Sequence, residues 1–309
     1  DGATGTWLQT QDLSLDDYGG EAMEGCTDIL GVTRPDVIAA LHSAYFEVGA
    51  DVVETNTFGA FGVPLGEYDI AHRSHEIALA NARIAREVAD GFSTPDRKRY
   101  VAGSLGPGTK SPSLSQIRFA ELRDHYQVAA EGLLEGGVDL FILETHFDLL
   151  AVKAAVIGVR RAMAKVGRQV PIQCQVTMEL TGRMLVGTEI SAALASIDPL
   201  GVDIIGLNCA TGPTEMSEHI RHLSQHSRVP ISVLPNAGLP SVVDGKMHYD
   251  LTPEQMETHQ RRFVEELGVQ VIGGCCGTTP EFIKLLADMA PNLTRATRTI
   301  DHEPSVASI

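Results

Sequence analysis

The stretch Gly136-Gly137-Val138-Asp139-Leu140-Phe141-Ile142-Leu143 shows how one helix gives way to one strand in this chain. Glycine ends a helix readily because it adopts left-handed backbone angles at no steric cost. The apolar run after Asp139 has the composition of a buried strand. Similar signals recur at residues 49–52, 201–203 and 268–270. The repetition predicts parallel units in which strands alternate with helices.

Seven short apolar runs carry this pattern through the chain. Their spacing of roughly 30 to 50 residues fits a (β/α)8 TIM-type barrel, whose usual size is about 250 residues or more. The predicted strands are residues 52–55, 100–103, 140–143, 172–176, 204–207, 231–234 and 269–272. Residues 1–6 have the composition of a loop that follows a strand, so we expect the first of eight strands to be largely missing from the start of the chain.

The helix before the first predicted strand has a readable start. Thr33 is expected to cap it, and Pro35 fits its first turn because the missing N–H of proline needs no partner there. Residues 8–32 precede this helix and form a polar, acidic segment with no clear period. At the other end, apolar periodicity is lost after Pro291. We therefore predict a barrel over residues 1–295 and a linker-like tail over residues 296–309 that leads toward a following domain.

Composition narrows the class of protein. Of 309 residues, 43% are hydrophobic and 21% charged, as in ordinary globular proteins. The net charge of -16 argues against nucleic acid or an anionic membrane as a partner. No apolar run is long enough to span a bilayer, and no signal peptide is visible. Five cysteines in a chain of this length do not form a disulfide framework, which favours the cytoplasm.

The chemistry of the chain is concentrated in Gly273-Gly274-Cys275-Cys276-Gly277, which follows the last predicted strand. Neighbouring side chains of a strand point to opposite faces, so two adjacent thiols can reach one ion only where the strand ends and the backbone turns. Cys209 follows another strand in the same way. Three thiolates without a fourth predict zinc with an open coordination position, which suits a thiol substrate.

Two other interpretations of these cysteines stay open. Buried cysteines are common and mostly inert, and adjacent cysteines are not among the usual spaced zinc motifs. A redox pair is the main rival, although the usual redox spacing is Cys-x-x-Cys. Cys26 and Cys174 lie away from strand ends and are expected to be inert.

The remaining strand ends carry polar side chains, and in parallel barrels the active site lies at that end. Glu144 and Asp1 are expected to bind substrate, with a structural carboxylate as the alternative for Glu144. Asn236 is a candidate fourth zinc ligand, and a turn role after Pro235 fits it equally well. The other candidates are Asn56 and Ser104, which fit loop contacts as well as substrate contacts, and His146, a weaker candidate ligand.

These residues resemble the homocysteine S-methyltransferase family, and within it the homocysteine-binding module of the cobalamin-dependent methionine synthases. The matching stretches are Asp1-Gly2-Ala3-Thr4-Gly5-Thr6, Glu54-Thr55-Asn56-Thr57-Phe58, Gly206-Leu207-Asn208-Cys209-Ala210, Pro235-Asn236-Ala237-Gly238-Leu239-Pro240 and residues 273–280. They span almost the whole chain. The chain lacks the Asp-x-His-x-x-Gly cobalamin signature, so we expect it to be an excerpt of a longer protein.

The resemblance implies a zinc barrel that binds homocysteine. It implies Cys209, Cys275 and Cys276 as zinc ligands that activate the substrate thiol for methyl transfer. It implies that the amino-acid end of homocysteine lies near Asp1, Gly2, Ala3, Ser104 and Glu144. The product would be methionine, with methylcobalamin supplied by another domain and with folate- and cobalamin-binding modules as partners. Two alternatives remain: a methyltransferase with a small donor such as betaine or S-methylmethionine, and a non-catalytic zinc or thiol-binding module.

Overall fold

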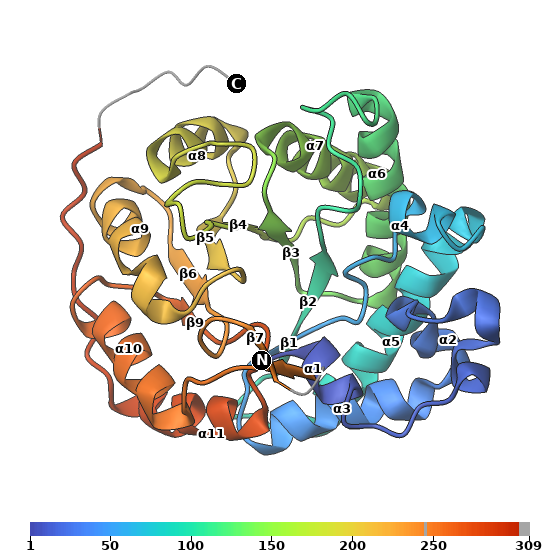
Figure 1. Cartoon of the computed structure of the whole chain (residues 1–309), viewed down its shortest axis with the longest axis horizontal. Coiled ribbons are helices and arrows are strands. Elements are labelled where there is room, and N and C mark those ends of the chain that lie inside the picture. The colour runs from blue at the N-terminus through green and yellow to red at the C-terminus, as the bar shows by residue number, and fades with distance from the viewer. Residues whose placement is uncertain (244–245, 303–309) are drawn as a thin grey trace. The chain divides into compact units, whose positions relative to one another are not determined.

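The computed structural model describes residues 1–243 and 246–302. The chain divides into two compact units. The first unit comprises Trp7–Leu143 and Leu150–Ile172, and the second comprises Asp1–Thr6, Glu144–Leu149 and Gln173–Ile309. Seven parallel strands are ordered in the sheet as they are along the chain, with helices between them (Figure 1).

The first unit alternates long helices with three parallel strands. Val52 pairs with Tyr100 between β1 and β2, and Ala102 pairs with Leu140 between β2 and β3. Its elements are α2 (Leu30–Thr33), α3 (Pro35–Glu47), β1 (Val52–Glu54), α4 (Gly62–Gly66), α5 (Ser74–Phe92), β2 (Tyr100–Leu105), α6 (Phe119–Gly136), the start of β3 (Leu140–His146) and most of α7 (Leu149–Val166). Short 3-10 helices span Leu15–Tyr18, Glu21–Met23, Thr27–Ile29 and Ala71–Arg73.

The second unit carries four parallel strands and a hairpin. Gln173 pairs with Ile204, Ile205 with Ile231, and Ser232 with Val271. Its elements are β4 (Ile172–Val176), α8 (Ile190–Ile197), β5 (Ile204–Asn208), α9 (Pro213–His226), β6 (Ile231–Leu234), β7 (Ser241–Val243), β8 (Lys246–His248), α10 (Pro253–Glu265), β9 (Val271–Ile272) and α11 (Pro280–Met289). Asp198–Leu200 and Ala290–Asn292 are 3-10 helices, and α1 (Thr4–Leu8) begins in this unit.

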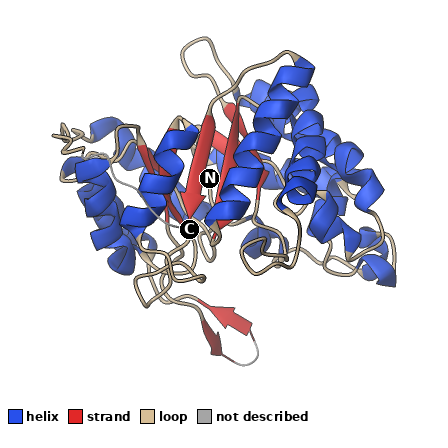
Figure 2. Ribbon diagram, turned by 90° about the horizontal axis from the view of Figure 1, so that it is seen from above, coloured by secondary structure: helices blue, strands red, loops and turns tan. Residues whose placement is uncertain are grey.

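All seven predicted strands are present, so the predicted fold class is confirmed. The antiparallel hairpin of β7 and β8 was missed because it lies within one βα connection and its strands have three residues each. Figure 2 shows these two strands extending away from the parallel strands of their unit. The prediction that Thr33 caps a helix is wrong. Thr33 is the last residue of α2, and its hydroxyl donates to the Ile29 carbonyl at 3.3 Å.

The start of the first unit is held by an apolar cluster. Leu8, Leu30, Val37 and Ile38 are buried together, and Trp7 packs against them. The acidic segment after residue 8 is therefore anchored by a few apolar side chains. Their spacing is irregular because the backbone runs in short 3-10 turns, which explains the absence of a period in the sequence.

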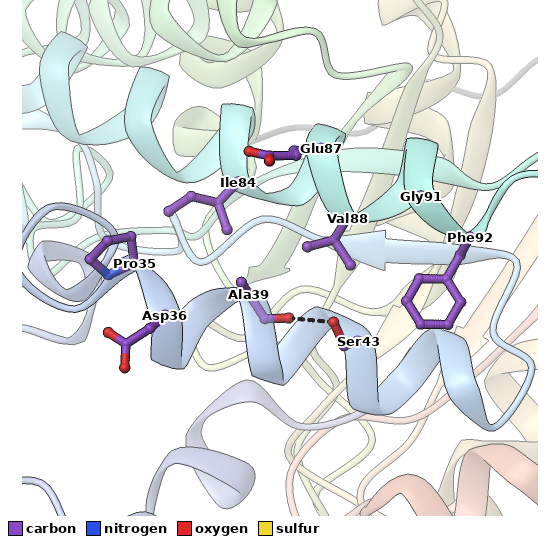
Figure 3. Close-up of a pocket in the computed structure, with 9 residues that line it drawn as sticks. All are labelled: Pro35, Asp36, Ala39, Ser43, Ile84, Glu87, Val88, Gly91 and Phe92. Atoms are coloured by element: carbon purple, nitrogen blue, oxygen red, sulfur yellow. Dashed lines mark hydrogen bonds between the residues drawn. The ribbon is translucent and has the colours of Figure 1, made fainter.

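Helices α3 and α5 border a shallow pocket of about 500 Å³ in the first unit (Figure 3). Its lining is mostly apolar, with Asp36 and Glu87 at its edge. Within it the Ser43 hydroxyl donates to the Ala39 carbonyl at 2.8 Å, a bond inside α3 itself. This pocket presents no group of chemical interest.

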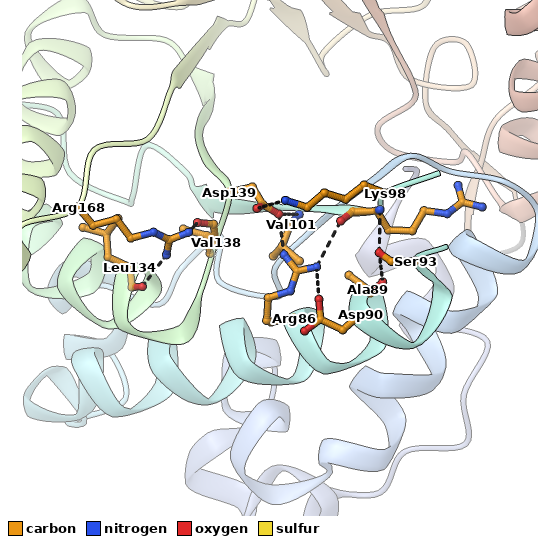
Figure 4. A network of polar contacts seen from close by, with 11 residues as sticks. Arg86, Ala89, Asp90, Ser93, Lys98, Val101, Leu134, Val138, Asp139 and Arg168 are labelled. Carbon is orange, nitrogen blue, oxygen red and sulfur yellow. Dashed lines mark hydrogen bonds and ion pairs between the residues drawn. The ribbon is translucent and has the colours of Figure 1, made fainter. Parts of the chain in front are cut away.

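A polar network in the first unit ties the amino-terminal ends of β2 and β3 to α5 (Figure 4). The Asp139 carboxylate accepts from Arg86 at 2.7 Å and from the Val101 amide at 2.9 Å. Arg168 donates to the carbonyls of Leu134 and Val138 at 2.9 and 2.6 Å. The charged groups of Arg86, Asp139 and Arg168 are all bonded to one another or to the backbone, so the network is structural.

Residues 296–302 have no helix or strand, yet they are hydrogen bonded to the second unit. The Ala296 amide donates to Val264, and Arg298 donates to Ser227 and Val229 at 3.1 and 2.8 Å. The predicted division at residue 295 stays a prediction, and residues 303–309 of the predicted tail lie outside the described residues. Within residues 1–243 and 246–302, no helix has the length and apolar character needed to cross a membrane.

Candidate metal centre

Two loops of the second unit bring three cysteines together. Cys209 directly follows β5, and Cys275 and Cys276 lie between β9 and α11. Their Sγ atoms lie within 4.8 Å of one another, and those of Cys209 and Cys276 are 3.7 Å apart. Among the described residues, no other group of three His, Cys, Asp or Glu side chains gathers its donor atoms this closely.

The backbone turns at both loops in ways that the cysteines require. Cys209 has a φ of 59°, which is uncommon for a residue with a side chain and turns its thiol out of the strand alternation. Gly277 has a φ of 81° directly after Cys276. A Cβ at Gly274 would lie 2.4 Å from Thr278 Oγ1, which donates to the Cys275 carbonyl at 2.5 Å. The glycines thus serve both turning and close packing.

A third loop, residues 235–237, is bonded to the cysteine loops. The Cys275 amide donates to Pro235 at 2.8 Å, and the Ala237 amide donates to Cys276 at 2.9 Å. Asn236 lies between them, and its backbone amide donates to the Thr211 carbonyl at 3.1 Å. The Asn236 side chain is 2% exposed, and its Oδ1 has no hydrogen-bond partner among the described residues. A buried oxygen without a donor is costly unless a cation takes that place.

The three thiols share protons unequally. Hydrogen bonds from Cys209 and Cys275 lower the pKa of Cys276 to about 3, against the opposing effect of burial. The pKa of Cys209 is lowered by the hydrogen bond that it accepts from Cys275. Its hydrogen bond to Cys276 and its burial outweigh this effect and raise the pKa of Cys209 to about 12. Donation to Cys209 and Cys276 raises the pKa of Cys275 well above its usual range. One thiolate and two thiols therefore share the centre near neutral pH.

These donors fit zinc. Three cysteine sulfurs are typical zinc ligands, and catalytic zinc sites combine three protein ligands with one exchangeable position. That Asn236 occupies this position in the absence of substrate stays a prediction.

Tyr249 is a residue of this centre that the sequence did not indicate. A Cβ added to Gly277 would lie only 2.5 Å from Cγ of the Tyr249 ring, so the ring packs directly against the Gly277 backbone. Its hydroxyl donates to the Cys276 sulfur. Burial and the negative charge of Cys276 raise the pKa of Tyr249. The residue directly follows the unpredicted hairpin, so no local pattern linked it to the cysteines.

Asn208 connects the thiols to Glu144. It is fully buried, and its Nδ2 lies 3.8 Å from the Cys275 sulfur and 3.3 Å from a Glu144 carboxylate oxygen. It also exchanges two hydrogen bonds with Thr145, at 2.7 and 2.8 Å. Asn208 was recognised in the sequence only as part of the strand end, with no role of its own.

The first three residues lie along the cysteine loop. The Asp1 carbonyl accepts from the Gly274 amide at 3.1 Å, and the Ala3 amide donates to Thr278 at 3.0 Å. Gly2 is buried between them. The structure thus places three of the predicted substrate residues beside the loop that carries Cys275 and Cys276.

Asn56 and Ser104 belong to the first unit and hold its loops together. Asn56 Nδ2 donates to the Thr27 carbonyl at 2.8 Å. The Ser104 amide donates to Thr55 Oγ1 at 3.0 Å, and its carbonyl accepts from Thr57 Oγ1 at 2.7 Å. Their role toward a substrate stays a prediction.

The other predicted side chains lie outside the cluster. Cys26 and Cys174 are buried and free, and burial raises their pKa values to about 11 and about 12. The His146 ring is fully buried, which lowers its pKa to about 4, and it does not join the thiol cluster.

Residues 1–290 match the family model of the homocysteine S-methyltransferases, so the chain belongs to that family of methyltransferases. It is 53% identical over its whole length to the methionine synthase of Mycobacterium tuberculosis (strain ATCC 25618 / H37Rv) and 51% identical to that of Mycobacterium leprae (strain TN). The chain spans 26% of the length of each of these relatives.

A solved structure supports the fold independently. The metallated form of the homocysteine methyltransferase MmuM from Escherichia coli superposes with a TM-score of 0.73, at 20% identity, over 93% of this chain and 94% of that one. At this identity the likeness establishes the fold, a TIM-type (β/α) barrel.

Proposed function

We propose that this chain is the homocysteine-binding module of a cobalamin-dependent methionine synthase and that Cys209, Cys275 and Cys276 hold a zinc ion. The observation that carries the proposal is the convergence of the three sulfurs within 4.8 Å of one another, in loops bonded to the loop that carries Asn236. The methionine synthases that match over the whole chain support the choice of reaction.

The substrate thiol needs activation because a free thiol, with a pKa near 8.5, is mostly protonated at neutral pH. Bound zinc supplies the Lewis acidity that stabilises the thiolate. The Tyr249 hydroxyl and the Asn208 amide donate toward Cys276 and Cys275 and hold these sulfurs in orientation. The product of methyl transfer to homocysteine is methionine.

The amino-acid end of homocysteine needs a carboxylate for its ammonium group. Glu144 is 7% exposed and is held by Asn208, which places a negative charge close to the thiols. We assign ammonium binding to Glu144, with Asp1, Gly2 and Ala3 beside it. Asn56 and Ser104 complete the proposed substrate set.

The methyl donor comes from outside this chain. We assign it to methylcobalamin on another module of the same longer protein, with a folate-binding module as the further partner. The 26% coverage of the relatives leaves room for such modules. Three free cysteines need a reducing compartment, so we place the reaction in the cytoplasm.

Zinc K-edge absorption of the zinc-loaded His226→Ala variant, in which the three cysteines are expected to hold the only zinc ion, tests the acceptor function. We expect about three sulfur ligands without substrate and about four with homocysteine, while homoserine, which carries oxygen in place of sulfur, leaves the count unchanged. In Asn236→Ala a water ligand replaces the amide oxygen, and the homocysteine state is unaffected. A sulfur count that does not rise with homocysteine would refute direct activation of the thiol.

The donor is identified by turnover. Zinc-loaded chain and homocysteine are supplied with methylcobalamin, betaine or S-methylmethionine in parallel, and methionine is measured. Methionine from methylcobalamin alone supports the proposal, whereas methionine from betaine or S-methylmethionine would support a small-donor enzyme. No methionine from any donor, together with an unchanged sulfur count, would support the non-catalytic module.

A further inference from the structure

Histidine and aspartate side chains line a pocket of about 640 Å³ in the second unit. The pocket is lined by α8, the carboxyl-terminal end of α9 and residues 301–302. Helix α9 begins four residues after Cys209 and has 14 residues, so its far end lies about 20 Å along the helix from the thiol loop. The pocket is therefore distinct from the thiol centre.

Two histidines of α9 face each other in this pocket. His222 and His226 are four residues apart, which places both imidazoles on one face of the helix. Their ring centroids are 4.5 Å apart, with a tilt of 41° between the rings. The same i, i+4 spacing on a helix presents paired imidazole ligands to zinc in metalloproteases.

The ring of His226 is oriented as in a metal-binding histidine. Its Nδ1 lies 2.7 Å from the backbone carbonyl oxygen of Asp301. A carbonyl only accepts, so Nδ1 carries the proton and the lone pair of the neutral ring lies on Nε2. A hydrogen bond of this kind behind the ring fixes the tautomer of most metal-ligating histidines.

The charges around the pair suit a cation with imidazole ligands better than an anion. Arg228 lines the pocket, but its guanidinium is held by the Asp198 carboxylate at 2.5 Å. Asp301 adds a second carboxylate, and His302 adds a third imidazole to the lining. Imidazole donors favour zinc, nickel and copper over calcium and magnesium.

We infer that His222 and His226 bind a divalent transition-metal ion of the zinc, nickel and copper class, with His302 as third ligand. His302 is exposed, and the donor atoms of the three histidines do not all lie within 4.8 Å of one another. In this inference the α9 pair binds the ion first, and His302 joins it. Because the Asp301 amide also donates to the Gln225 carbonyl at 2.8 Å, ion binding stabilises the position of residues 301–302 against α9.

Zinc stoichiometry of the reduced chain, measured by competition with a chromophoric chelator, tests the site. We expect two zinc ions on the unaltered chain and one on His222→Ala and on His226→Ala. His219→Ala is the matched control, since His219 lies on the same helix outside the pocket lining, and it keeps both ions. His302→Ala keeps the second ion with weaker affinity, and an unchanged affinity would remove His302 from the ligand set.

A variant that lacks the thiol site separates this inference from the proposed function. Cys276→Ala still binds one ion at the histidine pair, and Co²⁺ bound there shows no sulfur-to-cobalt charge-transfer band. Loss of zinc from Cys276→Ala together with His226→Ala confirms that the remaining ion used the pair. A second equivalent that persists in both His222→Ala and His226→Ala, or its absence from the unaltered chain, would overturn the inference.

Discussion

Cysteines of the second unit occupy two kinds of place, the interior of a strand and the turn beyond a strand. Cys174 lies inside β4, is completely buried, and has its pKa raised to about 12 by burial. Cys209, Cys275 and Cys276 lie beyond β5 and β9, where hydrogen bonding among them lowers the pKa of one thiol to about 3. A strand interior separates polar groups, whereas the ends of parallel strands gather them at one edge.

The amide side chains show the same difference. Gln175 is buried inside β4 and donates to the Ser232 hydroxyl of β6 at 3.0 Å, which holds strand to strand. Asn208 and Asn236 stand at strand ends: Asn208 contacts the Cys275 sulfur, and Asn236 lies in the loop bonded to Cys275 and Cys276. The Gln175 and Asn236 side-chain oxygens both lack a partner among the described residues, so the difference lies in what the amides contact. Changes inside the strands should therefore affect stability, and changes at their ends should affect binding.

Replacing one thiol of each kind should give the largest contrast. We expect Cys276→Ala to lose the zinc of the thiol centre, because two thiolates no longer complete the ligand set. Cys174→Ala keeps this zinc and lowers the free energy of unfolding by about 1 kcal/mol. Elemental analysis and denaturant unfolding of the reduced proteins measure the two effects. Since the histidine pair holds a separate ion, both variants are best compared in a His226→Ala background, and full zinc in Cys276→Ala there contradicts the centre.

The pH dependence of zinc binding sharpens the contrast further. Near pH 7 the metal-free centre holds two protons, since the pKa of Cys276 is lowered to about 3 while that of Cys209 is raised to about 12 and that of Cys275 is also raised. Zinc displaces both, so its affinity should rise with pH by about 100-fold per unit. Chelator competition between about pH 6 and pH 8 measures this slope. A slope near zero would mean that the thiols do not ligate the ion.

Removing the charge of Glu144 tests the strand end to which we assign substrate binding. Glu144→Gln keeps the shape but loses a charge-assisted bond of about 1.5–3 kcal/mol to the homocysteine ammonium, so affinity should fall roughly ten- to a hundredfold. Zinc content should stay normal. Calorimetric titration of the zinc-loaded protein measures both. Unchanged affinity would make Glu144 a structural partner of Asn208 and leave Asp1 to bind the ammonium.

The smallest effect on binding is expected inside the strands. Ser232→Ala leaves the buried Gln175 amide without its hydrogen-bond partner and should cost about 1–2 kcal/mol of stability. Zinc and homocysteine binding should not change, because neither residue reaches the strand ends. Unfolding in denaturant, with zinc stoichiometry as control, measures this. Loss of homocysteine affinity in this variant would remove the distinction between strand interior and strand end.

Local signals in the sequence were sufficient for the fold and for the thiols. The seven parallel strands were predictable from their apolar runs, several of which follow a helix stop, as at Gly137, whose φ is 96°. Cys209 and Cys275 could be assigned to strand ends because each follows such a run. The hairpin of β7 and β8 was not predicted, because a three-residue strand is too short to show a period of two in its sequence.

Contacts between distant residues were decided only by the tertiary structure. Asn208 reaches Thr145 across 63 positions and Cys275 across 67, and His226 meets Asp301 across 75. No local pattern marks such pairs, because each partner alone is an ordinary polar residue of a strand end, a helix or a loop. The sequence determined which side chains stand at the ends of strands and helices; folding determined which of them share a proton, leave an oxygen unpaired or face each other, because these depend on distances that only the packed chain sets.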